Sequence, residues 1–301
     1  MYQQHFGLSE TPFNLTPDTG YFFRYASHCE ALNTLVVAIR SGEGFVKVTG
    51  EVGTGKTLLC RKLLNELGDD IVTAYIPNPL LSADELREAL ADELNIEHQR
   101  NGDTHTLLKR INQRLIELRA NGKQVVLLID EAQAIPENTL EGLRLLTNLE
   151  TEKYKLLQVV LIGQPELDAL LDRKSIRQLK QRITFSYQIK SIDQGNIDAY
   201  VLHRLNVAGY SGPRLFSNSA IRLLARSSSG IPRMINILCH KALMSAYGTG
   251  ARQVDKQHIQ NAIRDTESSS GFSHNRWQTL DFGISACLLA GIGLIYMGVS
   301  L

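Results

Sequence analysis

The sequence predicts an α/β domain with a mostly parallel sheet, followed by a second domain made only of helices. Over the first 190 residues, short apolar runs rich in β-branched residues alternate with amphipathic stretches, which is the pattern of strands and their covering helices. After Ser191 no strand pattern returns. A glycine-rich loop directly after the first strand run is a further indication, because such loops join a strand to a helix in α/β sheets.

The apolar, β-branched runs predict the strands of the first domain. They cover residues 45–49, 71–76, 125–129, 156–162 and 183–189. The last run alternates strictly between apolar and polar side chains, which is typical of an edge strand with one face in water.

Helices are expected between the strands and throughout the second domain. Ser82 and Glu85 form a capping-box pattern at the start of a helix over 82–94. Another helix is expected over 103–120, where an Asn-Gly pair ends it. In the second domain, helices are expected over 193–207, 219–227, 232–247 and 255–265.

These elements divide the chain into four parts. Residues 1–190 form the α/β domain, 191–265 the helical domain and 266–281 a polar linker. Residues 282–301 contain no charged side chain. Twenty helical residues at 1.5 Å each span about 30 Å, the thickness of the hydrocarbon core of a bilayer. The sequence therefore predicts a C-terminal transmembrane helix over this last part; a helix buried in the helical domain or in an oligomer interface is the alternative.

Composition excludes several classes of protein. A hydrophobic content of 43% with 21% charged residues is incompatible with a disordered chain. The 32 basic and 31 acidic residues leave a net charge of +1, which argues against a mainly electrostatic nucleic-acid binder. No C-x-x-C pair occurs, so a zinc ribbon, a thioredoxin-like redox site and a disulfide framework are not expected of Cys29, Cys60, Cys239 and Cys287.

The loop after the first strand run has the sequence GEVGTGKT, and a helical stretch follows it. Its glycines let successive backbone N–H groups turn toward phosphate oxygens, and the start of the helix adds partial positive charge. Lys56 can then reach the β- and γ-phosphates of a nucleotide, while the hydroxyl of Thr57 is offered to Mg²⁺. The candidate nucleotide-binding residues here are Gly50, Glu51, Val52, Gly53, Thr54, Gly55, Lys56, Thr57 and Leu58.

Asp130 and Glu131 directly follow the third strand run, VVLLI. Open α/β sheets bind ligands at the carboxyl ends of their strands. We expect Asp130 to hold Mg²⁺ with Thr57, mainly through waters, and Glu131 to act as the general base that polarises the attacking water. An Asp-Glu pair in this place is also compatible with a simple helix N-cap. The glycine-rich loop upstream favours the metal and base roles.

With these motifs and a helical domain after the sheet, the chain resembles the AAA+ ATPases, which are P-loop NTPases with sheet order 5-1-4-3-2. The resemblance narrows to ATPases of the general secretion pathway component A (ExeA) type, and among them to those of mannose-sensitive haemagglutinin (MSHA, type IV) pilus biogenesis. It covers residues 1–265. The blocks that carry it are HFGLSETPFNLTPDTGYFF, SGEGFVKVTGEVGTGKTLLCRKLL, LLIDEAQAI, LIGQPEL, LKQRI and GIPRMIN.

The resemblance implies further site residues. Gln164, in LIGQPEL, matches a polar sensor that orients the attacking water; a helix-capping loop residue is the alternative. Arg233, in GIPRMIN, matches a second sensor that reaches the γ-phosphate from the helical domain; a surface arginine at a helix start is the alternative. Arg182, in LKQRI, matches the arginine finger that completes a neighbouring subunit's site. Arg177 competes for that role, and a solvated basic helix is the alternative to both.

In related ATPases the N-terminal segment packs over the adenine. The resemblance therefore implies stacking or apolar contact to the base within residues 6–23, which contain Phe6, Phe13, Phe22 and Phe23. Plain core packing is the alternative for these phenylalanines.

The function that the resemblance implies is that of an ATPase which binds and hydrolyses ATP with Mg²⁺ to drive assembly of an MSHA-like pilus or secretion apparatus. It would be anchored in the bacterial inner membrane by residues 282–301, with its ATPase domain on the cytoplasmic side. Implied partners are further copies of the chain and an inner-membrane assembly protein.

Two alternatives remain open. One is a DNA-acting AAA+ ATPase of the transposition-helper or origin-recognition kind, and the other is a nucleotide-gated adaptor that hydrolyses ATP slowly. The balanced net charge and the apolar run at 282–301 count against nucleic acid as a partner. Glu131 counts against the adaptor.

Overall fold

The structure is a computed structural model that describes residues 2–100, 102–147, 149 and 155–270. Its sheet has the order β2-β3-β4-β1-β5, and every neighbouring pair is parallel. This is the expected order 5-1-4-3-2 seen from the other edge, so the prediction of a parallel P-loop sheet is confirmed. The strands are β1 (Phe45–Gly50), β2 (Ile71–Ile76), β3 (Gln124–Ile129), β4 (Gln158–Gly163) and β5 (Ile183–Ile189).

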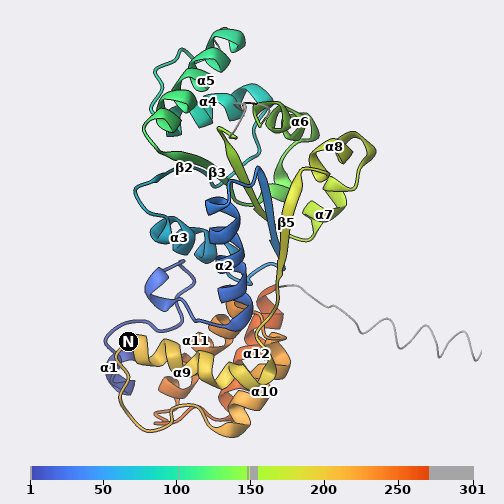
Figure 1. The fold of residues 1–301 in the computed structure, drawn as a ribbon. Coiled ribbons are helices and arrows are strands. Elements are labelled where there is room, and N and C mark those ends of the chain that lie inside the picture. The colour runs from blue at the N-terminus through green and yellow to red at the C-terminus, as the bar shows by residue number, and fades with distance from the viewer. Residues whose placement is uncertain (1, 101, 148, 150–154, 271–301) are drawn as a thin grey trace, which may run out of the picture.

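Helices cover both faces of the sheet (Figure 1). In β3, Val126 and Leu128 pack with α2 and α3, whereas Leu127 and Ile129 point to the opposite core under α4, α5 and α6. Because both faces are covered, β3 is apolar almost throughout. The helices of this domain are α2 (Ala26–Arg40), α3 (Lys56–Glu66), α4 (Ala83–Glu93), α5 (Thr104–Ala120), α6 (Glu137–Leu146), α7 (Glu166–Leu171) and α8 (Arg177–Lys180).

Several local predictions are confirmed. The side chain of Ser82 and the backbone of Glu85 form the expected capping box at the start of α4, and Asp103 caps α5. Strand β5 lies at the edge of the sheet, and its residues alternate between half-buried and exposed up to Ile189.

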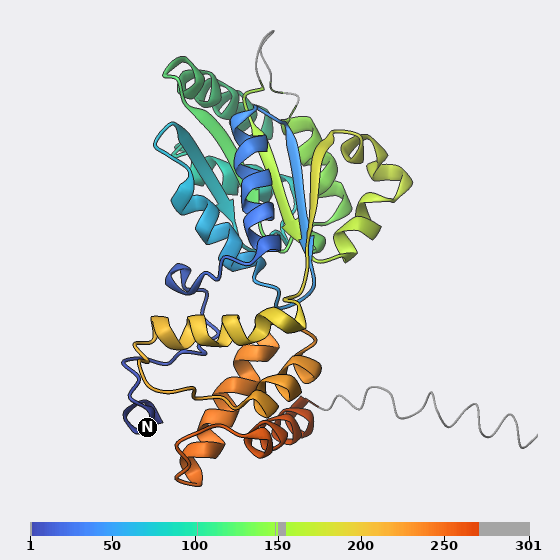
Figure 2. The same ribbon diagram turned by 60° about the horizontal axis from the view of Figure 1, so that its bottom comes forward.

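The second domain is helical and lies at the carboxyl end of the sheet, as Figure 2 shows. Its helices are α9 (Ile197–Val207), α10 (Asn218–Ser228), α11 (Pro232–Gly248) and α12 (Lys256–Ser270). Helix α12 therefore includes the first five residues of the expected linker, 266–270.

The N-terminal residues pack into the core of the helical domain, although they stand in the 1–190 part of the chain. Helix α1 (Tyr2–Phe6) lies against α11, and the hydroxyl of Tyr2 is 2.9 Å from Nδ1 of His240. The rings of Phe13 and Phe216 meet edge to face at 6.1 Å between centroids. Apolar spacing along a sequence shows that a segment is buried but not which core it joins, and here the chain begins in one domain and crosses to the other.

The predicted fold class is wrong in one part, the transmembrane helix. Within the described ranges, no helix has both the length and the apolar surface needed to cross a membrane. The described helices are amphipathic and bury one face against the sheet or against one another. The fold is therefore a sheet domain and a helical domain; residues 282–301, where the transmembrane helix was expected, lie outside the described residues.

Candidate functional site

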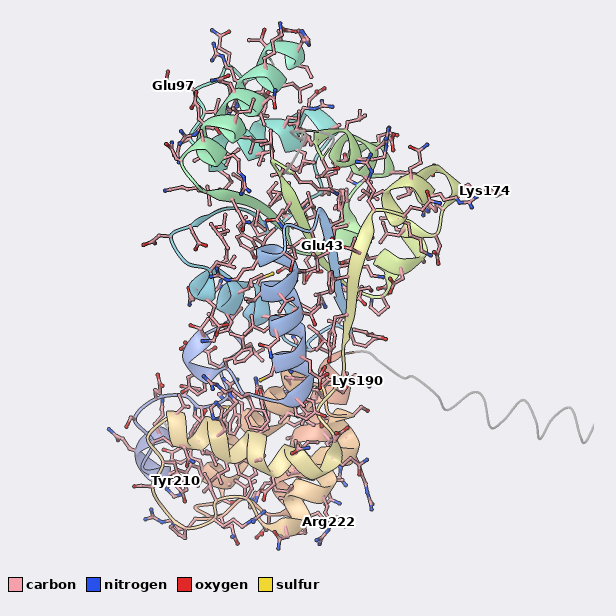
Figure 3. The ribbon with its side chains drawn as sticks, viewed as in Figure 1. Glu43, Glu97, Lys174, Lys190, Tyr210 and Arg222 are labelled. Atoms are coloured by element: carbon pink, nitrogen blue, oxygen red, sulfur yellow. The ribbon has the colours of Figure 1, made fainter. Side chains whose placement is uncertain are left out.

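A cavity of about 280 Å³ lies between the two domains, at the carboxyl ends of β1, β3 and β4. This is where open parallel sheets bind ligands. Figure 3 shows that side chains from both domains extend into the region between them. The lining residues are Asn14, Leu15, Thr16, Pro17, Asp18, Val52, Gly53, Gly55, Lys56, Thr57, Leu58, Glu131, Gln164, Tyr200, Arg204, Pro232, Arg233 and Asn236.

The loop between β1 and α3 has a backbone that requires glycine at two positions. Gly53 and Gly55 have φ angles of 82° and 96°, in the left-handed region that side chains with a Cβ adopt rarely. The loop is also held by α2, because Nε2 of the buried His28 on that helix lies 2.7 Å from the carbonyl oxygen of Thr54. The glycine-rich motif therefore forms a preorganised turn at the start of α3.

Lys56 lies inside this loop and is 5% exposed. Its Nζ donates hydrogen bonds to the carbonyl oxygens of Gly50, at 2.9 Å, and Glu51, at 3.1 Å. Burial lowers the pKa of Lys56, and the nearby carboxylates of Glu131 and Asp130 act against that shift. Phosphate groups bound in the loop would place negative charge beside this buried ammonium and compensate for its loss of hydration.

Thr57 and Asp130 meet at the point where a hard cation would be held. The hydroxyl of Thr57 donates to Oδ2 of Asp130 at 2.8 Å, and Oδ1 accepts the backbone N–H of Glu131 at 2.9 Å. Asp130 is 2% exposed, and burial raises its pKa. A hydroxyl and a carboxylate at this edge are oxygen ligands of the type that Mg²⁺ prefers, so the residues fit the metal.

Glu131 has a left-handed backbone, with φ 50° and ψ 38°, which is rare for a residue other than glycine. Its Oε2 accepts a hydrogen bond of 2.6 Å from Gln133 Nε2 and one of 3.0 Å from Gln164 Nε2. Burial raises the pKa of this carboxyl, but the two amides and the charge of Lys56 outweigh burial, so that its pKa is lowered. Glu131 is therefore an ionised, oriented carboxylate at the wall of the cavity.

The residues assigned by resemblance take different places. Gln164 and Arg233 line the cavity, and Gln164 contacts the carboxylate of Glu131. Arg182 does not line it. Its Nη1 donates instead to the carbonyl oxygen of Arg144 at 3.3 Å and to the hydroxyl of Thr147 at 3.2 Å, near the end of α6. Arg177 is exposed on α8.

The N-terminal segment lines the cavity through residues 14–18 and not through its phenylalanines. Phe6 and Phe13 are buried in the helical core, and Phe22 is buried in the core against α2 and α3. Phe23 packs on Tyr200, with 5.5 Å between ring centroids. The apolar surface offered to a base comes instead from Leu15 and Val52, which are half-exposed in the cavity wall.

Two arginines that the motifs did not indicate hold this segment in place. Arg204, on α9, is 5% exposed and donates to the carbonyl oxygens of Pro12 at 2.6 Å and Asn14 at 3.2 Å. Arg61, on α3, donates to the carbonyl oxygen of Pro17 at 2.6 Å. The sequence signal for Arg204 is a lone cation in the apolar stretch YVLHRLNV, where a buried arginine needs partners.

The fold and the site together define an AAA ATPase. Residues 39–171 match the family model described as "AAA domain". The chain is 42% identical over 294 residues to General secretion pathway protein A of Aeromonas hydrophila. The matched region covers 97% of this chain and 53% of that protein. The chain therefore belongs to the AAA ATPases of the General secretion pathway protein A (ExeA) type, and it spans about half the length of this curated relative.

Solved structures show the same fold at low identity. Cdc6p from Pyrobaculum aerophilum has a TM-score of 0.64 and 18% identity, over 84% of this chain and 70% of that one. The ORC2 protein of Aeropyrum pernix, in its ADPNP-ADP complexes, has a TM-score of 0.61 and 14% identity, over 85% of this chain and 73% of that one. At these identities the likeness concerns the arrangement of sheet and helices.

Proposed function

We propose that this ATPase binds ATP and Mg²⁺ in the cavity between its domains and uses Glu131 as the general base. The observation that carries the proposal is the convergence on one cavity of the loop lysine, the Thr57–Asp130 pair and the Glu131 carboxylate. Bound Mg²⁺ would supply positive charge against the phosphates. Thr57 and Asp130 would hold it, mainly through waters.

The protein's own residues account for the remaining parts of hydrolysis. The loop N–H groups and Lys56 bind the phosphates, while Gln164 and Arg233 contact the γ-phosphate and its attacking water. Glu131 takes a proton from that water as the water oxygen bonds to the γ-phosphorus and the bond to the β-phosphate oxygen breaks. The proton on Glu131 then returns to bulk solvent with product release.

We further propose that hydrolysis drives assembly of a secretion apparatus or a type IV pilus of the MSHA kind. The support is the 42% identity to General secretion pathway protein A over nearly the whole chain. The proposed partners are other copies of the chain and an inner-membrane assembly protein. The chain would work on the cytoplasmic side of that membrane, where ATP is available.

The experiment that tests the site is a comparison of two glutamates. Glu131→Gln is expected to bind ATP and retain it with at least about a hundredfold loss of turnover, since general-base catalysis contributes that much or more. Glu117→Gln, on the exposed face of α5, is the matched control and should hydrolyse normally. Normal turnover by Glu131→Gln would refute the base role. Crosslinking of the wild-type chain in native membranes tests the assembly role by identifying what it contacts.

One observation favours the DNA-acting alternative. Residues 191–265 carry nine arginines and lysines against four aspartates, so the helical domain is basic although the whole chain is balanced. A basic domain attracts polyanions in a salt-dependent way. Fluorescence anisotropy with duplex DNA at low and physiological salt decides: binding that persists at physiological salt and is lost in Arg222→Glu/Arg226→Glu would support this alternative over the assembly role.

A further inference from the structure

Gln133 lies beside the proposed base but is not among the residues that line the cavity. It belongs to the short 3-10 turn η2 (Ala132–Ala134) that follows β3. Its Nε2 donates to Glu131 Oε2 at 2.6 Å, and its Oε1 accepts the backbone N–H of Gln164 at 2.9 Å. One side-chain amide therefore connects the segment after β3 to the segment after β4, with both of its ends in hydrogen bonds.

The end of β4 leaves space for this amide. A Cβ on Gly163 would lie 2.9 Å from Oε1 and 3.2 Å from the backbone nitrogen of Gln133. The distance to Oε1 is shorter than a real Cβ atom adopts, and the distance to the nitrogen is tighter than usual, so even an alanine at position 163 would push the amide away. The absence of a side chain at Gly163 and the position of Gln133 depend on each other.

The two amides bond to the same oxygen of Glu131. Gln133 and Gln164 both donate to Oε2, and within the described residues no hydrogen bond to Oε1 is found. The left-handed backbone of Glu131 directs the carboxylate toward the cavity, and the amides fix its rotation about the last bond of the side chain. Oε2 thus holds the carboxylate in its orientation, and among the described residues no donor bonds to Oε1.

We propose that Gln133 is a positioning residue for ATP hydrolysis: it holds Glu131 by Oε2 so that Oε1 is the oxygen that accepts the proton of the attacking water. This inference rests on the proposed base role of Glu131. Gln133 acts only through that carboxylate and makes no contact with the nucleotide.

Loss of the amide has a consequence that an ordinary loss of stability would not produce. The carboxylate would rotate more freely, so turnover would fall while nucleotide affinity stayed the same. A loss of folded protein would instead lower turnover and nucleotide binding together.

The test compares Gln133→Met, which keeps the side-chain length and removes both hydrogen bonds, with Gln133→Asn, which keeps an amide that is too short. Gln113→Met is the matched control, because Gln113 Nε2 donates to Glu117 Oε1 at 3.1 Å on the exposed face of α5, far from the cavity in sequence and fold. For each full-length variant, kcat and the dissociation constant for a fluorescent ATP analogue are measured.

We expect both Gln133 variants to lose about tenfold in kcat, with nucleotide affinity unchanged within about twofold. Gly163→Ala should reproduce this phenotype, and Gln113→Met should match the wild type. A wild-type or faster kcat in both Gln133 variants, or a fall in nucleotide affinity as large as the fall in kcat, would overturn the inference.

Glu131→Gln separates this failure from that of the proposed function. If Glu131→Gln is inactive but the Gln133 variants are normal, the base role stands and the positioning role falls. If Glu131→Gln is itself normal, both fall. Adding Gln133→Met to Glu131→Gln should lower kcat no further, because the positioned group is already lost. A further loss in the double variant would show that Gln133 acts by another route.

Discussion

The backbone N–H of Arg233 donates a 3.1 Å hydrogen bond to the carbonyl oxygen of Gly53, so that α11 begins directly on the glycine-rich loop between β1 and α3. The helical domain and the loop therefore share a hydrogen bond between backbone atoms. A movement of the loop on nucleotide binding would pass through this bond to α11, which also carries the Arg233 side chain.

This contact predicts the effect of a small substitution, Gly53→Ala. The added Cβ would lie 2.7 Å from Cβ of Arg233, and φ at this position is 82°. Backbone strain alone costs about 1 kcal/mol for a non-glycine residue. Because the clash also separates α11 from the loop, we expect nucleotide affinity to fall at least about tenfold.

Gly122→Ala is the matched control for that prediction. Gly122 has a similar φ of 75° but no atom within 4 Å of an added Cβ. It should lose about 1 kcal/mol of stability and keep its nucleotide affinity. Titration with a fluorescent nucleotide and thermal unfolding measure both quantities; equal nucleotide affinities in the two variants would contradict the role of the Arg233–Gly53 contact.

Arg204 is predicted to hold the N-terminal segment against the cavity. Arg204→Met keeps the apolar part of the side chain and removes the donors to Pro12 and Asn14, so a buried carbonyl group and a partly buried one lose their partner. We expect a loss of about 2–3 kcal/mol in the free energy of unfolding and weaker nucleotide binding. Arg222→Met, at an exposed position on α10, should change neither by more than about 0.5 kcal/mol. Urea unfolding with and without nucleotide checks this.

The parts of the site that could be predicted from sequence are those that depend on local order along the chain. The turn at Gly53 and Gly55, the lysine after it and the carboxylates at the end of β3 all follow from which residues stand directly after a strand. The sheet order followed from the resemblance, and the strand positions from runs of apolar residues.

The parts that could not be predicted are contacts between segments distant in sequence. Arg204 and Pro12 are 192 residues apart, and the packing of Phe13 on Phe216 needs the N-terminus to join the second domain. The hydrogen bond from Gln133 to Glu131 is local, but Gln133 also accepts a hydrogen bond from the backbone of Gln164. That second bond depends on the position of β4 beside β3, which the sequence around Gln133 does not indicate. Hydropathy alone also made the C-terminal run a membrane helix, which the described fold does not include.

A pH dependence of stability is expected from one buried and two half-buried histidines. Burial lowers the pKa of His28, His203 and His240 from 6.5, so the unfolded chain binds more protons than the folded one as pH falls below 6.5. Their contribution to stability is therefore present above pH 6.5 and is lost as pH falls, by up to about 1.4 kcal/mol per pH unit for each residue that stays neutral in the fold.

His28 can be isolated from the others by His28→Gln. Glutamine can still donate to the carbonyl oxygen of Thr54 but does not titrate in this range. Urea unfolding is measured between about pH 7.5 and 5, a range that includes the ordinary histidine pKa of about 6.5. The free energy of unfolding should depend less steeply on pH in His28→Gln. The exposed His105→Gln should retain the wild-type slope. Identical slopes in His28→Gln and the wild type would exclude His28 as a contributor.

Arg182 is predicted to complete the active site of a neighbouring copy of the chain. Within its own chain it lies away from the cavity and donates to Arg144 and Thr147, at the end of α6, and these contacts hold the guanidinium at the start of β5. Arg182→Ala should therefore bind ATP normally and lose hydrolysis by about 10³-fold or more, the contribution typical of an arginine supplied in trans.

Mixing experiments separate this role from a purely structural one. Lys56→Ala is expected not to bind ATP but has an intact Arg182, so a mixture with Arg182→Ala should regain activity at sites where the two chains meet. A chain carrying both substitutions should give no recovery when mixed with Arg182→Ala. If the Lys56→Ala mixture also stays inactive while Arg177→Ala is complemented in the same assay, the finger is Arg177. The exposed Arg177 on α8 would then reach the neighbouring γ-phosphate. The hydrogen bonds of Arg182 at the end of α6 would serve the fold alone.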